Sequence, residues 1–388
     1  MKKIQEIAII GGGASGIFCS LILKEKLPNV NVTIYEAQNK IGKKILQTGN
    51  GKCNLSNTNL SIDNYNTTKI KNILENFDYK KLISILNKFG LMTRIDSEGR
   101  IYPYSEKATT VLDVFLEKLK EYNVNIKCDS YIKKISYNNK FIIETSNESF
   151  NSDYVIICTG GQSSINYNYN TDNLLKQFNH SLTTFSPSLC ALKTKENTKH
   201  LSGLRVKCKA SIIVDGKILK QTKGEILFKD DGLSGIAIFI LSQYYNKDKK
   251  CYISLDLYED KTVEELNNKL INNKNLETNL LGYFPKMVNL DLIKRINTNL
   301  SIGEIIKNYT FEIKGTYGFN NSQVTKGGVS LSEINLENLE SKKQEKLYIA
   351  GEALDVDGSC GGFNLHFAFA SGYTIANNLI ELLGDKNE

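Results

Sequence analysis

The sequence predicts an α/β protein in which a parallel, Rossmann-like sheet is interrupted by a largely antiparallel β region. Near the N-terminus an apolar strand runs into a glycine turn, and a helical stretch and a second apolar strand follow. Beyond Pro187 the pattern changes to strand-like runs with hairpin turns, and residues 347–383 return to a strand, a glycine loop and a helix. That order predicts one α/β domain that is discontinuous in sequence, with a second domain inserted into it.

The glycine turn at residues 11–16, GGGASG, matches the G-x-G-x-x-G pattern of a dinucleotide site. Residues 14–27 are predicted to form the helix after it, and residues 30–36 a second buried strand. Glu36 ends that strand, where a carboxylate hydrogen-bonds a ribose hydroxyl and repels a 2′-phosphate, so FAD or NAD is favoured over NADP. A glycine-rich turn without a ligand is the alternative. The contacts expected here are Gly11, Gly13, Ala14, Ser15, Gly16, Glu36 and Ala37.

The rest of the first domain mixes helices and strands. Apolar spacing predicts amphipathic helices over 79–89 and 109–122. Strands are expected over 124–128, 132–136, 141–145 and 154–158. We expect the last two of these strands to frame a β-meander.

The inserted region carries two local signals. Asp215-Gly216 stands between strand-like runs within 206–228, which predicts a hairpin turn. From residue 261 to about 309 the pattern is helical, and Thr262 and Glu265 are spaced as a capping box.

A loop rich in small residues and lysines, 42–57, follows the ribose-binding acid. Such a loop can wrap a cofactor's phosphate and ribityl chain, because backbone N–H groups and a cation oppose negative charge. A solvated surface loop is the alternative. The contacts expected here are Lys43, Lys44, Gly49, Asn50, Gly51, Cys53 and Asn54.

Three later segments combine a strand or turn with small residues. The apolar strand 155–158 ends in Thr159, Gly160 and Gly161, where the chain passes close beneath a cofactor in a two-dinucleotide fold, although a plain strand-turn has the same pattern. A glycine pair in VTKGGV, 324–329, suits a simple turn nearly as well as a ligand contact.

The third segment is a strand, 347–350, followed by an acidic glycine loop and a helix. Its carboxylate is expected to meet a ribityl hydroxyl, and the helix N-terminus to face the flavin. An acidic loop or a calcium site is the alternative, but the spacing does not match an EF-hand, and no metal is predicted. The expected contacts are Gly351, Glu352, Asp357, Gly362, Phe363 and Asn364.

The composition excludes several classes of protein. The longest apolar stretches, such as 236–241, fall far below the ~20 residues of a membrane span, and the N-terminus does not fit a signal peptide, so no membrane contact and a cytoplasmic location are predicted. The eight cysteines form no C-x-x-C and no metal-ligand spacing, which disfavours a zinc site, a disulfide framework and a flavin disulfide reductase. The net charge of +7 comes without a stripe of interleaved arginine and aromatic residues, so no nucleic-acid partner is predicted.

Taken together, six strings resemble the BaiN-like, or aminoacetone oxidase, family of bacterial NAD(P)/FAD-dependent oxidoreductases, and the match runs nearly end to end. The strings are GGGASG at 11–16, GKKILQTGNGKCNLSN at 42–57, GRIYPYSEKA at 99–108, GEILFKDDGLSG at 224–235, VTKGGVSLSEI at 324–334 and GEALDVDGSCGGFNLHFAFASG at 351–372. Two departures stand out: Lys52 replaces the expected Arg, which loses the bidentate fork, and His366 replaces the more usual Gln.

The resemblance implies FAD as the cofactor and three domains. They are a discontinuous FAD-binding domain over 1–186 and 330–388, an inserted β-barrel-like domain over 187–258 and 310–329, and a small helical domain over 259–309.

The expected activity is hydride transfer through flavin N5 on a small-molecule substrate, with NAD(P)H or dioxygen as the second redox partner. No catalytic acid or base is assigned: His366 reads better as a structural helix histidine, and Cys53 and Cys360 as small packing residues. Two other hypotheses stay open, a flavin-dependent tRNA-modifying enzyme and a flavin-binding regulator without turnover. The oligomeric state is left unassigned.

Overall fold

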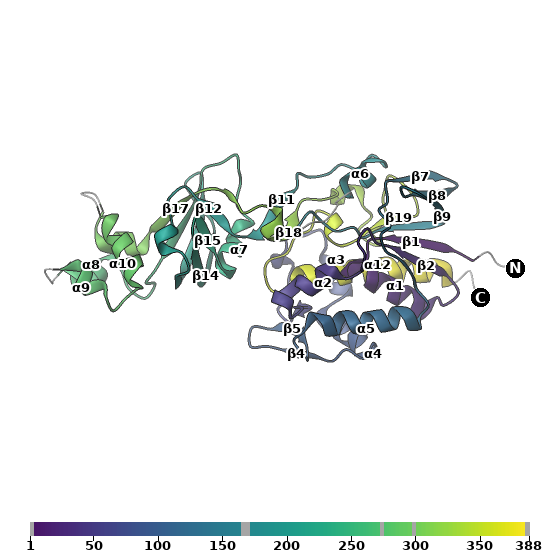
Figure 1. The fold of residues 1–388 in the computed structure, drawn as a ribbon, viewed down its shortest axis with the longest axis horizontal. Coiled ribbons are helices and arrows are strands. Elements are labelled where there is room, and N and C mark those ends of the chain that lie inside the picture. Colours follow the sequence, from purple (N-terminus) through teal and green to yellow (C-terminus); the bar gives the residue numbers. More distant parts are fainter. Residues whose placement is uncertain (1–3, 164–170, 272–274, 297–299, 385–388) are drawn as a thin grey trace. The chain divides into compact units, whose positions relative to one another are not determined.

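The chain forms two compact units, and each has its own hydrophobic core (Figure 1). The discontinuous unit combines residues 1–186 with 324–388, and the inserted unit spans residues 187–323. The computed structural model describes residues 4–163, 171–271, 275–296 and 300–384.

A five-stranded parallel sheet, in the order β19-β10-β1-β2-β6, forms the centre of the discontinuous unit. Its strands are β1 (Glu6–Ile10), β2 (Asn31–Tyr35), β6 (Asn125–Lys127), β10 (Tyr154–Ile157) and β19 (Leu347–Ile349). Ile9 pairs with Ile34 on one side and with Ile156 on the other, and all three side chains are buried. Such continuous apolar strands are typical of a parallel sheet covered on both faces. The predicted Rossmann-like fold is therefore confirmed.

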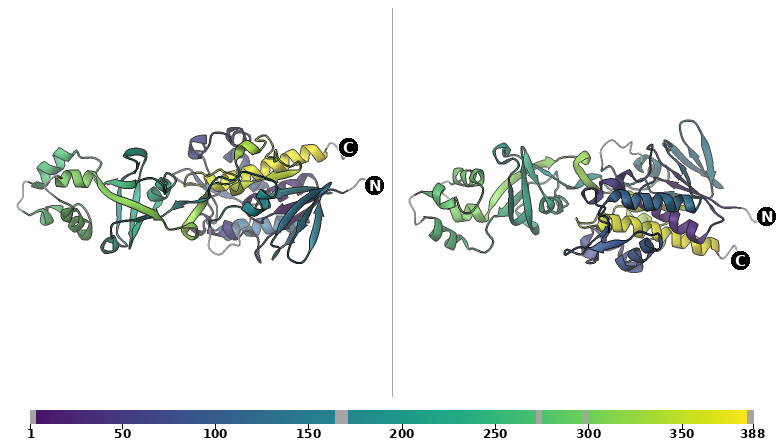
Figure 2. Two further views of the ribbon diagram at one scale, coloured as in Figure 1. Left: turned by 90° about the horizontal axis from the view of Figure 1, so that it is seen from above. Right: turned by 60° about the horizontal axis from the view of Figure 1, so that its bottom comes forward.

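Three long helices pack together beside this sheet. They are α1 (Ala14–Lys26), α5 (Ala108–Glu121) and α12 (Phe363–Gly384). Phe369 on α12 lies 5.0 Å from Phe18 on α1 and 6.2 Å from Phe115 on α5, measured between ring centroids. Gly372 lets α12 approach α1 closely, because a Cβ there would lie 2.6 Å from the carbonyl oxygen of Ser15. Figures 1 and 2 show the C-terminal helix running along the N-terminal one.

An antiparallel meander accompanies the parallel sheet. Its strands are β7 (Lys134–Asn138), β8 (Lys140–Glu144) and β9 (Ser149–Ser152). The prediction that residues 154–158 frame this meander is wrong, since β10 pairs with β1 and β19 instead. The uniformly apolar β10 suits the interior of a sheet, whereas the polar, half-exposed β9 completes the meander.

The remaining elements of this unit are short. They are α2 (Lys43–Gln47), β3 (Ser56–Asn57), α3 (Lys71–Asn76), α4 (Tyr79–Lys88), β4 (Thr93–Ile95), β5 (Arg100–Pro103) and α6 (Thr171–Lys176). Strands β3, β5 and β4 form a small sheet in that order. Asp78 caps α4, because its side chain accepts the N–H of Lys81 at 2.8 Å, and this helix and α5 agree with the predicted amphipathic segments.

A closed, six-stranded antiparallel barrel makes up most of the inserted unit, in the order β12-β15-β14-β13-β16-β17. Its strands are β12 (Leu192–Thr194), β13 (Arg205–Val214), β14 (Lys217–Lys229), β15 (Gly232–Ser234), β16 (Cys251–Asp256) and β17 (Tyr309–Thr316). Asp215 and Gly216, with φ of 49° and 77°, form the predicted tight turn between β13 and β14. The barrel confirms the predicted fold class of the insertion.

Helices fill the segment between β16 and β17. They are α8 (Val263–Ile271), α9 (Leu276–Leu280), α10 (Lys286–Lys294) and α11 (Ile302–Lys307), while α7 (Ile236–Ser242) packs against β14. The Thr262 and Glu265 capping box forms as predicted, with bonds of 2.9 and 3.2 Å. Asp291 on α10 joins this helical part to the barrel. Its carboxylate accepts hydrogen bonds from His200, Tyr309 and Arg295 at 2.6, 2.6 and 2.8 Å.

The chain enters the inserted unit through β11 (Ser186–Cys190) and returns through β18 (Ser322–Lys326). Within the ranges given above, none of the helices has the length and apolar character needed to cross a membrane.

Candidate functional site

In the glycine turn after β1, each of the three motif glycines can be compared with the role that a dinucleotide site gives it. Gly11 has φ of 109°, and a Cβ there would overlap the carbonyl group of Cys158 at the end of β10. A Cβ on Gly16 would overlap the carbonyl oxygen of Gly11, so this glycine permits close helix–strand packing. A Cβ on Gly13, by contrast, would meet no other part of the described chain within 4 Å. The first and third glycines are therefore required by the fold, while the second opens onto free space at the position where a dinucleotide site brings the backbone close to the pyrophosphate.

Helix α1 starts at this open position. Its N-cap is Gly13, no side chain caps the first turn, and the first turn holds no acidic residue. Within the described residues, no side chain caps the positive end of the helix dipole and no acidic residue of the first turn offsets it. An anionic phosphate group at the start of the helix would supply one.

Glu36, just after β2, is held in place by the turn. Its carboxylate accepts the N–H of Gly12 at 2.8 Å and the N–H of Gln38 at 2.9 Å. Two backbone donors fix the orientation of the carboxylate, as a ribose contact at this point requires. Sequence reasoning missed the segment 128–130, which lies beside it: the N–H of Ser130 donates to the carbonyl oxygen of Glu36 at 2.8 Å.

Lys44, Glu352 and Thr325 come from three distant segments of the sequence, and Glu352 contacts both of the others. Lys44 on α2 forms an ion pair with Glu352, which follows β19, and the N–H of Thr325 on β18 donates to the other oxygen of Glu352 at 2.5 Å. A Cβ on Gly161 would lie 2.9 Å from the Glu352 carboxyl carbon and 2.5 Å from the Thr325 hydroxyl oxygen. The predicted residues Lys44, Gly161 and Glu352 therefore do come together. Thr325 was not among the residues predicted, and its VTKGGV string gave only a weak signal.

Beside this cluster, the end of β10 is tied to α6. The hydroxyl of Thr171 bonds the hydroxyl of Thr159 at 2.5 Å and donates to the carbonyl oxygen of Gly160 at 3.1 Å. Gly160 has φ of 73°, and the nearest atom to a Cβ there would be a Glu352 oxygen 3.9 Å away. An added side chain at Gly160 would therefore point toward the Glu352 carboxylate.

The loop after α2 runs through a series of left-handed residues. Gly49, Asn50, Gly51 and Cys53 have φ between 54° and 82°. Burial raises the pKa of the Cys53 thiol to about 12, which agrees with a packing role and not with a thiolate. Lys43 turns to Gln38, at 3.3 Å from its side-chain oxygen.

The acidic glycine loop before α12 is closed by its own polar groups. Asn364 bonds the backbone of Gly358 in both directions, accepting its N–H at 2.8 Å and donating to its carbonyl oxygen at 2.7 Å. The N–H of the buried Asp357 donates to Asn66 at 3.0 Å. These contacts give Asn364 and Asp357 a part in shaping the loop. Gly362 has φ of 98°, and a Cβ there would overlap Ser56 and Asn54, so Gly362 is required by this packing.

His366 is a structural residue, as predicted. Its Nδ1 bonds the hydroxyl of Ser56 at 2.8 Å and its Nε2 bonds the carbonyl oxygen of Phe77 at 2.9 Å. Burial lowers the pKa of the imidazole to about 4, so the ring is neutral near pH 7. Burial also raises the pKa of the Cys360 thiol to about 12. The described residues contain no cluster of ligands that would hold a metal ion.

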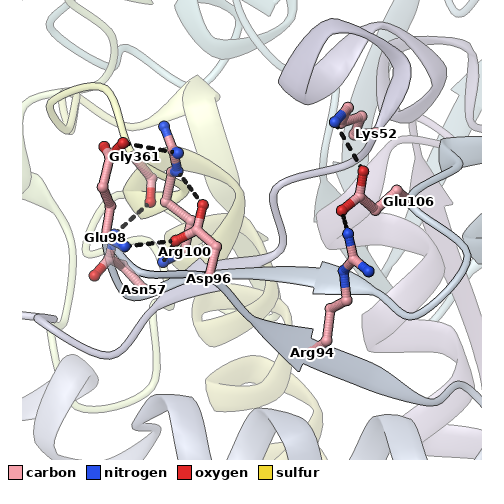
Figure 3. Close-up of polar contacts among 8 residues, drawn as sticks. All are labelled: Lys52, Asn57, Arg94, Asp96, Glu98, Arg100, Glu106 and Gly361. Carbon is pink, nitrogen blue, oxygen red and sulfur yellow. Dashed lines mark hydrogen bonds and ion pairs between the residues drawn. The ribbon is translucent and has the colours of Figure 1, made fainter.

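The small sheet β3-β5-β4 is attached to the acidic glycine loop, as Figure 3 shows. Asn57 on β3 donates to the carbonyl oxygen of Gly361 at 3.1 Å. Arg100, its partner on β5, is held by Asp96 at 2.7 Å and by Glu98 at 3.0 Å. At the other end of the sheet, Lys52 pairs with Glu106 at 2.8 Å.

Comparison with known proteins agrees with this architecture. Residues 5–378 match the family described as "HI0933-like protein Rossmann domain". The 3-dehydro-bile acid delta(4,6)-reductase of Clostridium scindens is 30% identical over 95% of this chain and 98% of its own length. The ribosomal RNA dihydrouridine synthase of Haemophilus influenzae is 26% identical over 97% and 98%. The crystal structure of 3-ketosteroid delta1-dehydrogenase from Sterolibacterium denitrificans superposes with a TM-score of 0.50 at 9% identity, over 97% of this chain and 99% of that one.

FAD supplies hydride chemistry when bound, and the open Gly13, the uncapped start of α1 and the oriented Glu36 carboxylate fit its ADP half. The chain therefore belongs to the HI0933-like Rossmann family and is an FAD-binding oxidoreductase.

Proposed function

We propose that this protein reduces a carbon–carbon double bond conjugated to a carbonyl group, with NAD(P)H as the source of electrons. The observation that carries the proposal is the reaction shared by two relatives that match almost the whole chain. One name describes reduction at positions 4 and 6 of a bile acid with a 3-keto group, and the other describes the saturation of uracil, whose double bond is conjugated to a carbonyl. The steroid and the uracil differ in size and charge, but the bond that is reduced is of the same kind.

In this reaction a hydride is added to the carbon β to the carbonyl and a proton to the α carbon, so two electrons and two hydrogens are accounted for. Gly13 and the start of α1 would hold the pyrophosphate, and Glu36 a ribose hydroxyl. Glu352, fixed by Lys44 and Thr325, would meet the ribityl chain. No side chain of the site is assigned as a catalytic acid or base, so we assign the proton to water.

A small molecule remains the first choice of substrate, and a uracil within RNA is the second. One observation favours the second: residues 187–323 hold 21 of the 49 lysines and arginines but only 15 of the 42 aspartates and glutamates. The inserted unit thus carries +6 of the net +7, and a phosphate backbone is attracted by such an excess. This second candidate is broader than the flavin-dependent tRNA-modifying enzyme considered from the sequence, because it includes any RNA that contains uracil.

The test is an anaerobic titration of the purified holoprotein. NADH or NADPH is added until the flavin absorption is bleached, and a conjugated keto acid, 3-oxochol-4-en-24-oate, or unmodified ribosomal RNA is then supplied. The proposal expects the flavin to reoxidise and the product to gain two mass units of hydrogen by mass spectrometry. Bleaching by NAD(P)H followed by reoxidation only in air contradicts it and favours an oxidase. No bleaching by either nucleotide favours the regulator.

A further inference from the structure

The turn around Tyr104, within the string GRIYPYSEKA at 99–108, carries an unusual surface. Tyr104 is 69% exposed and Met92 is 65% exposed, the two highest values among the large apolar side chains of the described residues. They are also neighbours, because the N–H of Tyr104 donates to the carbonyl oxygen of Met92 at 2.8 Å, just beyond the paired ends of β4 and β5. Adjacent exposed apolar side chains of this size mark a binding surface more often than scattered ones do.

The backbone around Tyr104 is held in one conformation. The N–H of Glu106 donates to the carbonyl oxygen of Pro103 at 2.9 Å, and Glu106 has φ of 51°, a left-handed value that a glutamate adopts at a cost. The hydroxyl of Ser105 donates to Thr110 at the start of α5 at 2.8 Å. Tyr104 is therefore displayed at the tip of a closed turn.

A charged group lies beside this pair. Glu106 bonds Lys52 at 2.8 Å and also forms an ion pair with Arg94, as Figure 3 shows. Two cations share one carboxylate, so the group keeps a net charge of +1. The side chains of Lys52 and Arg94 are 54% and 48% exposed, so that charge faces solvent.

This surface is built on the same scaffold as the cofactor site. Lys52 directly precedes Cys53 in the loop that is expected to wrap the cofactor. Strand β5, which leads into the turn, pairs with β3 through Ile101 and Ser56, and Ser56 bonds His366 on α12. A ligand held at Tyr104 is thus held by a rigid extension of the cofactor-binding loops.

We infer that Tyr104, Met92 and Arg94 form a substrate recognition face for a planar conjugated ring that carries an anionic substituent, a carboxylate or a phosphate. The inference rests on the proposed function and adds the class of its substrate. The tyrosine ring and the thioether offer a surface for the ring system. The uncompensated positive charge beside them selects the anion.

The experiment measures binding by calorimetry to the oxidised holoprotein, without reductant. The probes are 3-oxochol-4-en-24-oate with its methyl ester, and uridine 5′-monophosphate with uridine. We expect each anion to bind about 4-fold more tightly than its neutral partner, the effect of one nearby charge in water. Tyr104→Ala should weaken both members of a pair about 10-fold, and Tyr104→Phe should not. Arg94→Gln should abolish the preference for the anion, whereas Glu106→Gln should increase it.

Tyr244→Ala, an exposed tyrosine of the inserted unit, and Arg205→Gln, an ion-paired surface arginine there, are the matched controls. Equal binding by wild type, Tyr104→Ala and Arg94→Gln overturns the inference. So does the absence of binding by both anions up to about 1 mM, the upper end of usual KM values. A change in oligomeric state with unchanged affinity also overturns it and makes the face a subunit contact. If the variants alter binding but no probe is reduced in the anaerobic titration, the proposed reaction is wrong while the recognition face is supported. Binding of the steroid pair would identify a carboxylate as the anion, and binding of the uridine pair would identify a phosphate.

Discussion

The substitution Gly13→Ala separates cofactor binding from folding. Among the residues that the structure describes, a Cβ at Gly13 would contact no other part of the chain within 4 Å, and the φ of −86° suits alanine. Alanine gains about 0.4–1 kcal/mol by restricting the unfolded chain, but it is a poorer N-cap than glycine by a similar amount. The free energy of unfolding of the apoprotein should therefore change by less than about 1 kcal/mol.

The effect on FAD should be much larger, because the added methyl group occupies the space through which a pyrophosphate reaches the start of α1. Losing one charge-assisted hydrogen bond costs about 1.5–3 kcal/mol, which is a fall in affinity of about 10- to 150-fold. The assay is fluorescence titration of apoprotein with FAD, alongside urea unfolding of the same samples. Gly282→Ala in the inserted unit is the control, since a Cβ there also meets nothing within 4 Å. An FAD affinity within about 2-fold of wild type would refute the argument, since that is only about 0.4 kcal/mol.

Three further predictions test other parts of the chain. Glu36→Lys should leave folded protein without flavin after desalting, and a full flavin absorption spectrum would rule out the ribose contact. Burial opposes the charged form of Glu333, but hydrogen bonds from Ser181 and His180 outweigh it and lower its pKa to about 2. The Glu333 carboxylate therefore stabilises the fold by about 1–3 kcal/mol above about pH 4.5, and this stability is lost as the pH falls toward 2. Glu333→Gln should make the free energy of unfolding in urea depend less on pH below about 4.5. An unchanged pH dependence would count against this role of Glu333. Asp291→Ala leaves the buried Tyr309 hydroxyl without its acceptor and removes the carboxylate partner of the partly exposed Arg295 and His200. It should cost about 1–3 kcal/mol in thermal unfolding of the inserted unit, with FAD affinity unchanged, and a loss of FAD would mean that the two units are coupled.

The sequence predicted those parts of the site that local pattern determines. The glycine turn, the helix after it and the acid at the end of the next strand lie within about 25 residues, so periodicity and spacing suffice to find them. His366 was recognised as structural for a related reason, since it lies on the buried face of an apolar helix. The hairpin at Asp215 and the capping box at Thr262 are likewise local signals.

What the sequence did not reveal depends on contacts between distant segments. Lys44 and Glu352 lie 308 positions apart, and nothing in either string indicates that they pair. Thr325 and Thr171 join the site through one N–H and one hydroxyl, which leave no compositional trace. The strand predicted over 154–158 was assigned to the wrong sheet. A short apolar run suits the edge of an antiparallel sheet and the interior of a parallel sheet equally well, and only its neighbours decide between them.

The discontinuous sheet also has a consequence for the order in which the newly made chain folds. Strand β10 ends at Ile157, but its neighbour at the edge of the sheet, β19, ends at Ile349, and α12 follows only after that. Ribosomes add about 5–20 residues per second, so the N-terminal strands wait roughly 10–40 seconds for the segment that completes their sheet. The inserted barrel, made in between, has all of its strands earlier. Nascent chains should therefore contain a folded insertion flanked by an unfinished nucleotide-binding domain, and FAD can be captured only after β19 and α12 have been made.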